Sequence, residues 1–236
     1  MPESLRTHPL TPSRIGSLEN GLGLPPGEIY RPAPDPAWDR VRAILLAIDA
    51  PAQALREFGE RAGSGLAFDL DLLGVVHARQ GDPVAAAAQF RRAVAAAPGE
   101  ARYALDLGLA LWAIGDATGA RAEIGRALKL PGGAANSYAW FALGEIARAE
   151  GRNAEALERY ARATELGPPL AEAHYQFALA LSGTARLGEA DFHFARAAGL
   201  RGDYTGALAS YRRARERLGA DPAWATRIDA ALAHME

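Results

Sequence analysis

The stretch SYAWFALGEIARAEGRNAEALERYARATELGPPL, residues 137–170, decides the fold because the chain contains two further versions of it. These are residues 67–100 and 101–136, which directly precede it. Each version holds a Leu-Gly pair, a second glycine seven residues later and a proline near its end. With the segment that begins at residue 171, the starts lie 34, 36 and 34 residues apart. A repeat of this length is typical of stacked helical or β units, each of which buries its apolar face against its neighbours.

Small and large residues at fixed places predict that each unit is a pair of closely packed antiparallel helices. A glycine in the middle of the first helix and alanines in the second let the two helices approach, while a large residue fills the gap between neighbouring units. The proline then ends the second helix, because its ring removes an N–H donor. In unit order, the mid-helix glycines are Gly74, Gly108 and Gly144, the large residues Phe90, Ile124 and Tyr160, and the turn glycines Gly81, Gly115 and Gly151.

This pattern resembles the tetratricopeptide repeat (TPR), and Trp140 stands where the signature Trp of that family falls. The resemblance implies an all-α fold, a TPR superhelix of antiparallel helix pairs. The composition agrees, because alanine is abundant and β-branched residues, which lose more freedom in a helix, are sparse.

The same pattern extends in both directions and predicts a TPR array over residues 37–236. Asp221-Pro222 forms an N-cap and first-turn pair that predicts a last helix with a polar outer face. One helix near residue 190 fits two units, as second helix of one and first helix of the next. Besides the three full units, the predicted parts are a degenerate repeat at about 35–66, a repeat at 171–200, a half-shifted repeat at 188–219, a capping helix at 221–234, a Pro/Gly-rich linker at 19–36 and a non-TPR segment at 1–18.

Signals of catalysis and of metal or nucleic-acid binding are missing from the sequence. It contains no HExxH, P-loop or GxSxG motif and no cysteine. A net charge of −2 without a basic stripe argues against nucleic acid as a partner. His77, His174 and His193 fall on predicted repeat helices, where we expect structural roles. We therefore predict no enzyme, no cofactor, no metal site and no membrane span in this chain.

Recognition is the chemistry that remains, because the first helices of a TPR superhelix line a concave groove. Aromatic residues interleaved with arginines, the types that dominate binding hot spots, occupy the matching positions. We expect a protein or peptide to bind there. Asp71 and Leu105 stand where a C-terminal carboxylate clamp would need Lys or Asn, so no such clamp is predicted. The predicted groove residues are Phe68, Arg79, Arg102, Leu105, Trp112, Tyr138, Phe141, Glu145, Arg148 and Tyr175, with Asp71 and Glu172 beside them.

The opening LRTHPLTPSRI, residues 5–15, is not TPR sequence. It resembles the segment that ends the catalytic domain of HExxH zinc metallopeptidases of the beta-barrel assembly-enhancing (BepA-like) type, where a Pro-rich linker and a TPR array follow. The matching residues are Thr7, His8, Pro9, Arg14 and Ile15. The resemblance implies that residues 1–18 are the remnant of a zinc metalloendopeptidase domain. His8 would lie near the zinc only in a full-length parent, because one histidine cannot hold a catalytic zinc.

Two functions therefore remain open. The first is the non-catalytic C-terminal part of a periplasmic zinc metalloprotease that acts in outer-membrane protein quality control, with outer-membrane assembly machinery among its partners. The second is a stand-alone cytoplasmic TPR adaptor or scaffold, which Met1 and the missing signal peptide favour. An enzyme in its own right is disfavoured by the missing motifs.

Overall fold

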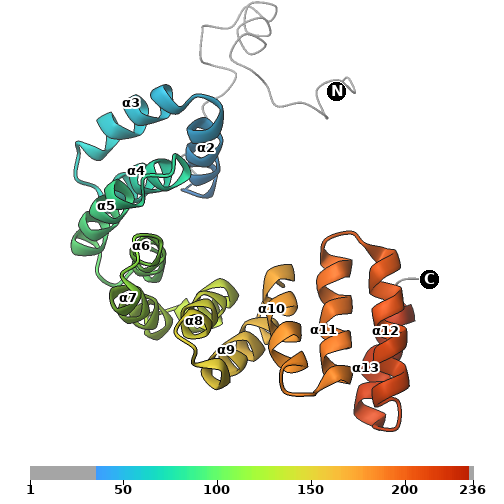
Figure 1. The fold of residues 1–236 in the computed structure, drawn as a ribbon. Coiled ribbons are helices and arrows are strands. Elements are labelled where there is room, and N and C mark those ends of the chain that lie inside the picture. Colours follow the sequence, from blue (N-terminus) through green and yellow to red (C-terminus); the bar gives the residue numbers. More distant parts are fainter. Residues whose placement is uncertain (1–35, 234–236) are drawn as a thin grey trace, which may run out of the picture. The chain divides into compact units, whose positions relative to one another are not determined.

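The computed structural model describes residues 36–233 of the 236-residue chain, and over this range the fold is all-α, as predicted. The predicted segment 1–18 with His8, and the linker 19–36 apart from its last residue, lie outside the described residues. The described helices, shown in Figure 1, are α2 (Pro36–Asp49), α3 (Pro51–Ala62), α4 (Ala67–Arg79), α5 (Pro83–Ala96), α6 (Ala101–Ala113), α7 (Ala117–Lys129), the 3-10 helix η2 (Gly133–Ala135), α8 (Ser137–Ala149), α9 (Asn153–Glu165), α10 (Ala171–Ser182), α11 (Leu187–Leu200), α12 (Tyr204–Leu218) and α13 (Pro222–Ala233).

The chain divides into two compact units, residues 1–42 and 43–236. Of the first unit, only the helical residues 36–42 are described. In the second unit each helix from α3 onward packs against the next one along the chain. The most extensive contact joins α11 to α12, and those of α4 with α5, α6 with α7, α8 with α9 and α10 with α11 are nearly as large. The second unit is therefore a row of antiparallel helix pairs in which α11 has a partner on each side.

Mid-helix glycines allow the close approach within each pair. A Cβ atom placed on Gly108 would lie 2.5 Å from Cγ1 of Ile124, closer than two carbon atoms can approach. The same construction at Gly74 meets the ring of Phe90 at 2.5 Å, and at Gly144 it meets the ring of Tyr160 at 2.5 Å. The steric role predicted for these glycines is therefore confirmed. The large residue lies against the glycine of its own unit.

The turn glycines between the paired helices adopt the left-handed conformation. Gly81, Gly115 and Gly151 have φ angles of 79°, 87° and 74°, a region that residues with a Cβ rarely occupy. Asp82 and Asp116 follow directly, and their carboxylates accept hydrogen bonds of 2.9 and 2.8 Å from the amide three residues on. Each turn thus reverses the chain, and the first two also cap the next helix, whereas Arg152 after Gly151 makes no side-chain cap.

Aromatic side chains fill the core at the C-terminal end of the array. Phe192 on α11 contacts Tyr211 on α12 and Trp224 on α13, with ring centroids 5.6 and 5.2 Å apart. Ile228 of α13 is fully buried in the same cluster. These contacts hold α13 against the preceding helices and fix one wall of the cavity described below.

Replacing Gly108 with alanine should lower the free energy of unfolding by about 1–3 kcal/mol, because the added methyl group overlaps Ile124 in a filled interior. Gly125 of α7 is the matched control, since nothing lies within 4 Å of a Cβ placed there. Gly125→Ala should raise stability by about 0.5–1 kcal/mol through helix propensity alone. Urea unfolding followed by circular dichroism measures both changes. Equal effects of the two substitutions would contradict the packing role of Gly108.

Candidate functional site

The ten predicted groove residues, here called the first-helix set, all lie on α4, α6, α8 and α10. Their side chains differ in accessibility. Leu105 is only 7% exposed and belongs to the apolar core, whereas Tyr138 is 46% exposed. The exposed members are Arg79, Tyr138 and Arg148, and the half-buried members are Phe68, Arg102, Trp112, Phe141, Glu145 and Tyr175. Nine of the ten therefore retain surface that a partner can touch.

Arg102 of α6 links the first helices of two adjacent units. Its guanidinium lies over the ring of Phe68 on α4 at 5.7 Å and over that of Tyr103 at 5.2 Å. The Nε atom of Arg102 lies 3.9 Å from Oδ2 of Asp71, a carboxylate with no exposed surface. Stacking and charge together hold the guanidinium in one place, so this arginine is oriented before any partner arrives.

On α8, four members of the first-helix set form a continuous surface, here called the α8 patch: Tyr138, Phe141, Glu145 and Arg148. The rings of Tyr138 and Phe141 lie 6.0 Å apart. The Glu145 carboxylate accepts a hydrogen bond from the hydroxyl of Tyr160 and pairs with Arg148 at 2.9 Å. Burial raises the pKa of Tyr160, and Glu145 raises it further, so the hydroxyl stays a donor. Tyr160 of α9 thus fixes Glu145, and through Glu145 it also positions Arg148.

Tyr175 of α10 is also held by its neighbours. Its ring meets that of Phe194 edge-on at 5.6 Å, and the Arg201 guanidinium lies over it at 5.0 Å. Arg201 pairs in turn with Glu172 at 2.6 Å. One face of the Tyr175 ring is therefore covered by a cation, which leaves the α8 patch as the more open aromatic surface.

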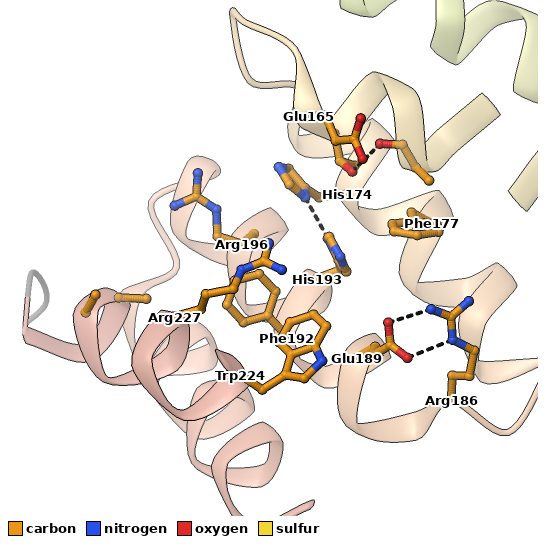
Figure 2. A pocket seen from close by; sticks show the side chains of 14 residues that line it. Glu165, His174, Phe177, Arg186, Glu189, Phe192, His193, Arg196, Trp224 and Arg227 are labelled. Carbon is orange, nitrogen blue, oxygen red and sulfur yellow. Dashed lines mark hydrogen bonds and ion pairs between the residues drawn. The ribbon is translucent and has the colours of Figure 1, made fainter. Parts of the chain in front are cut away.

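A cavity of about 580 Å³ lies between α9, α10, α11 and α13 (Figure 2). Its lining combines aromatic rings, three arginines, two glutamates and two histidines. We name it the α10–α13 cavity. The residues that line it are Ala161, Thr164, Glu165, His174, Phe177, Arg186, Glu189, Phe192, His193, Arg196, Trp224, Arg227, Ala230 and Ala231.

Two buried histidines face each other in this cavity. The Nδ1 atoms of His174 and His193 lie 3.0 Å apart, and the residues are 4% and 7% exposed. One Nδ1 must carry a proton and donate it to the other. The Nε2 atom of His174 is buried and has no hydrogen-bond partner within the part of the chain that the structure describes.

Both histidines are neutral at pH 7. Burial lowers the pKa of His174 to about 4, with a further contribution from Arg196. Burial also lowers the pKa of His193 to about 3, and the positive charges of Arg227, Arg196 and Arg186, together with that of His174 whenever it is protonated, act in the same direction. A charged imidazolium would lose its hydration and meet like charges here, so the neutral form is favoured.

The arginines of the cavity differ in their partners. Arg186 forms an ion pair with Glu189 at 2.6 Å. Arg227 lies over the rings of Trp224 at 4.6 Å and Phe192 at 5.2 Å. Over residues 36–233, neither Arg196 nor Arg227 has a carboxylate within ion-pair distance. The cavity therefore holds two guanidiniums whose charge no described side chain neutralises.

Sequence reasoning missed the α10–α13 cavity, although it placed His174 and His193 on repeat helices. The two histidines are 19 residues apart and match no metal-ligand spacing. Their meeting depends on the orientations of two rings, one on α10 and one on the shared helix α11, which no residue pattern reports. In the described range, no group of three or more His, Cys, Asp or Glu side chains is arranged to hold a metal ion, and no helix there is long and apolar enough to cross a membrane.

Comparison with known proteins agrees with this fold. Residues 72–101 and 105–171 match the family model described as tetratricopeptide repeat. Over these segments the match agrees with the helix pairs described above and supports the prediction of TPR units. No match was found among curated proteins.

Several solved structures share the fold at low sequence identity. MamA (residue 41 to the end) from Desulfovibrio magneticus RS-1 is 19% identical and superimposes with a TM-score of 0.56, over 70% of this chain and 94% of that one. PilF of Pseudomonas aeruginosa gives 17% identity and a TM-score of 0.55, over 83% and 99%. YrrB, described as a TPR protein with an unusual peptide-binding site, gives 23% and 0.52, over 75% and 92%. At these identities the likeness shows the fold alone.

Acid should destabilise the protein through the histidine pair. Between about pH 6.5 and pH 4 the unfolded chain binds protons at His174 and His193 that the folded chain excludes, so the free energy of unfolding falls as the pH falls. The loss is up to about 1.4 kcal/mol per pH unit for each histidine. Urea unfolding at pH 7, 6 and 5 measures it.

His193→Gln should make the acid dependence shallower, whereas the control His77→Gln, at a half-buried position on α4, should leave it unchanged. The same slope in the wild type and in His193→Gln would contradict the role given to the pair.

Proposed function

We propose that the chain binds a protein segment along its first helices, with the α8 patch as the centre of the contact. The observation that carries this proposal is the arrangement of that patch. Tyr138 is 46% exposed although its ring packs on Phe141, and Glu145 holds Arg148 in an ion pair. Tyr and Arg are enriched in binding hot spots, and side chains already held in place lose less entropy when a partner binds.

The chemistry of the patch suggests the chemistry of its partner. Two aromatic rings offer an apolar surface for an aliphatic or aromatic side chain. The Glu145–Arg148 pair beside them offers both a donor and an acceptor for the main chain of an extended peptide. We therefore expect the bound segment to carry an apolar anchor flanked by accessible backbone. The description of YrrB as a peptide-binding TPR protein is compatible with this mode.

A narrower proposal concerns the parent protein. The opening motif around His8 and the helix shared by two repeats support the reading of this chain as the C-terminal part of a BepA-like periplasmic metallopeptidase. In that setting the array would present clients of outer-membrane assembly to a zinc protease domain, and the zinc would belong to that domain. The competing proposal is a cytoplasmic adaptor that acts by binding alone.

Loss of the exposed aromatic should weaken peptide binding. Peptides selected from a random twelve-residue display library against the purified chain should bind Tyr138→Ala at least tenfold more weakly than wild type, because hot-spot aromatics contribute about 2 kcal/mol or more. Tyr204→Ala on α12 is the matched control, since that tyrosine is 67% exposed on a second helix. Fluorescence anisotropy measures the affinities. Equal losses in both variants, or a loss only at Tyr204, would refute the proposed surface.

The two proposals predict proteins of different mass in different cell compartments. An antibody raised against this segment should detect, in fractionated source cells, a periplasmic protein about twice the 24.9 kDa of this chain if the metallopeptidase proposal holds. A cytoplasmic band near 24.9 kDa would refute it and favour the adaptor.

A further inference from the structure

We propose that the α10–α13 cavity is a binding site for a carboxylate carried on an apolar or aromatic group. The site is separate from the α8 patch and goes beyond the peptide-binding function proposed above. Its walls come from α9, α10, α11 and α13, all within the second compact unit. The volume of about 580 Å³ lies in the range typical of pockets for small molecules or for one or two side chains.

The charged residues of the lining favour an anion as the ligand of this cavity. The lining contains three guanidiniums, those of Arg186, Arg196 and Arg227, against the carboxylates of Glu165 and Glu189. Glu189 is engaged by Arg186 at 2.6 Å, and Glu165 by Arg162, outside the lining, at 3.0 Å. The positive charge that remains in the cavity argues against a metal ion or an amine as its ligand and favours a singly charged anion.

The position of Arg227 leaves its donors without an acceptor side chain among residues 36–233. The guanidinium lies over the faces of Trp224 at 4.6 Å and Phe192 at 5.2 Å. Stacking occupies the face of the guanidinium plane, whereas the N–H groups point outward along its edge. A carboxylate that meets this edge accepts two parallel hydrogen bonds, the geometry that arginine provides best. In the view of Figure 2, the side chains of Arg196 and Arg227 lie on one side of the histidine pair and Arg186 lies on the other.

The histidine pair supplies the second, independent observation. Because one Nδ1–H donates to the other Nδ1 across 3.0 Å, the accepting ring, which is neutral, carries its single N–H proton on Nε2. When His193 is the Nδ1 donor, His174 presents an Nε2–H group. That atom is buried in the lining and has no partner among residues 36–233, a costly state for a polar group. A carboxylate oxygen satisfies it without any change in the charge of the pair.

The rest of the lining calls for an apolar body on the ligand. Phe177, Phe192 and Trp224 contribute rings, and Ala230 and Ala231 of α13 leave room between them. A small hydrophilic anion such as acetate would leave these surfaces in contact with water. An aromatic or branched apolar group next to the carboxylate covers them, and this combination gives the site its selectivity.

Isothermal titration calorimetry on the full 236-residue chain tests the proposal with 3-phenylpropionate as the probe and 3-phenylpropanamide as its neutral counterpart. We expect the acid to bind with a stoichiometry of one and the amide to bind at least about tenfold more weakly, because the charge-assisted hydrogen bonds are lost. Equal binding of acid and amide, or no binding of either, would overturn the proposal.

Two arginine variants test whether 3-phenylpropionate binds in this cavity. Arg227→Gln should reduce the affinity for 3-phenylpropionate about tenfold or more, and because Arg227 is an exposed residue of α13 the variant is expected to fold. Arg212→Gln is the matched control: it removes the same charge from an exposed position on α12 outside the lining. Unchanged affinity in Arg227→Gln, or the same loss in both variants, would contradict the site.

The carboxylate could belong to the C-terminus of a peptide or to a free small acid, and a second pair of probes distinguishes these two sources. A peptide that ends in Ala-Ala-Phe with a free carboxylate competes with 3-phenylpropionate if the cavity takes a chain terminus, whereas the same peptide with an amidated end does not. If neither peptide competes while 3-phenylpropionate binds, the site takes a free small acid. Displacement by both peptides would overturn the requirement for a carboxylate. Tyr138→Ala should leave all these affinities unchanged, so failure here is separable from failure of the proposed peptide surface.

Discussion

The close approach of paired helices at a mid-helix glycine is the constraint on which the rest of this structure depends. At Gly74, Gly108 and Gly144 a single Cβ atom would occupy space that a large residue of the second helix already fills. The first helix is thereby fixed against its partner over the same contact in each unit. Each unit then presents the other side of its first helix in a reproducible way, and the residues proposed to bind a partner follow from that repetition.

Packing also explains why the α8 patch is well defined. Tyr160 contacts Gly144 with its ring, and its hydroxyl donates a hydrogen bond to Glu145. The same side chain thus closes the helix pair and positions the polar half of the patch. In the other two full units a hydrocarbon side chain, Phe90 or Ile124, takes this place and offers no hydroxyl. The third full unit therefore combines the common architecture with a feature of its own.

The sequence predicted the fold wherever sterics act locally. The left-handed turn glycines could be predicted because each needs only its own backbone to explain it. The mid-helix glycines could be predicted because each recurs in register with the large residue of the helix paired with it. Ala185 shows the limit, since it takes a φ of 60° at the turn before α11, where the pattern offers no glycine. The His174–His193 contact could not be predicted at all. It depends on two ring orientations and on the helix α11 being shared between neighbours. Arg196 and Arg227, which have no carboxylate partner among residues 36–233, line one cavity only when α13 is in place.

The central claim is that partners contact the first helices. A photo-crosslinking amino acid placed at Tyr138, and at the exposed Glu158 on the second helix α9, tests it directly in cells that make the protein. We predict a discrete crosslinked product from position 138 that peptides selected for binding suppress, and none from position 158. Products from position 158 alone, or equal products from both positions, would contradict the account.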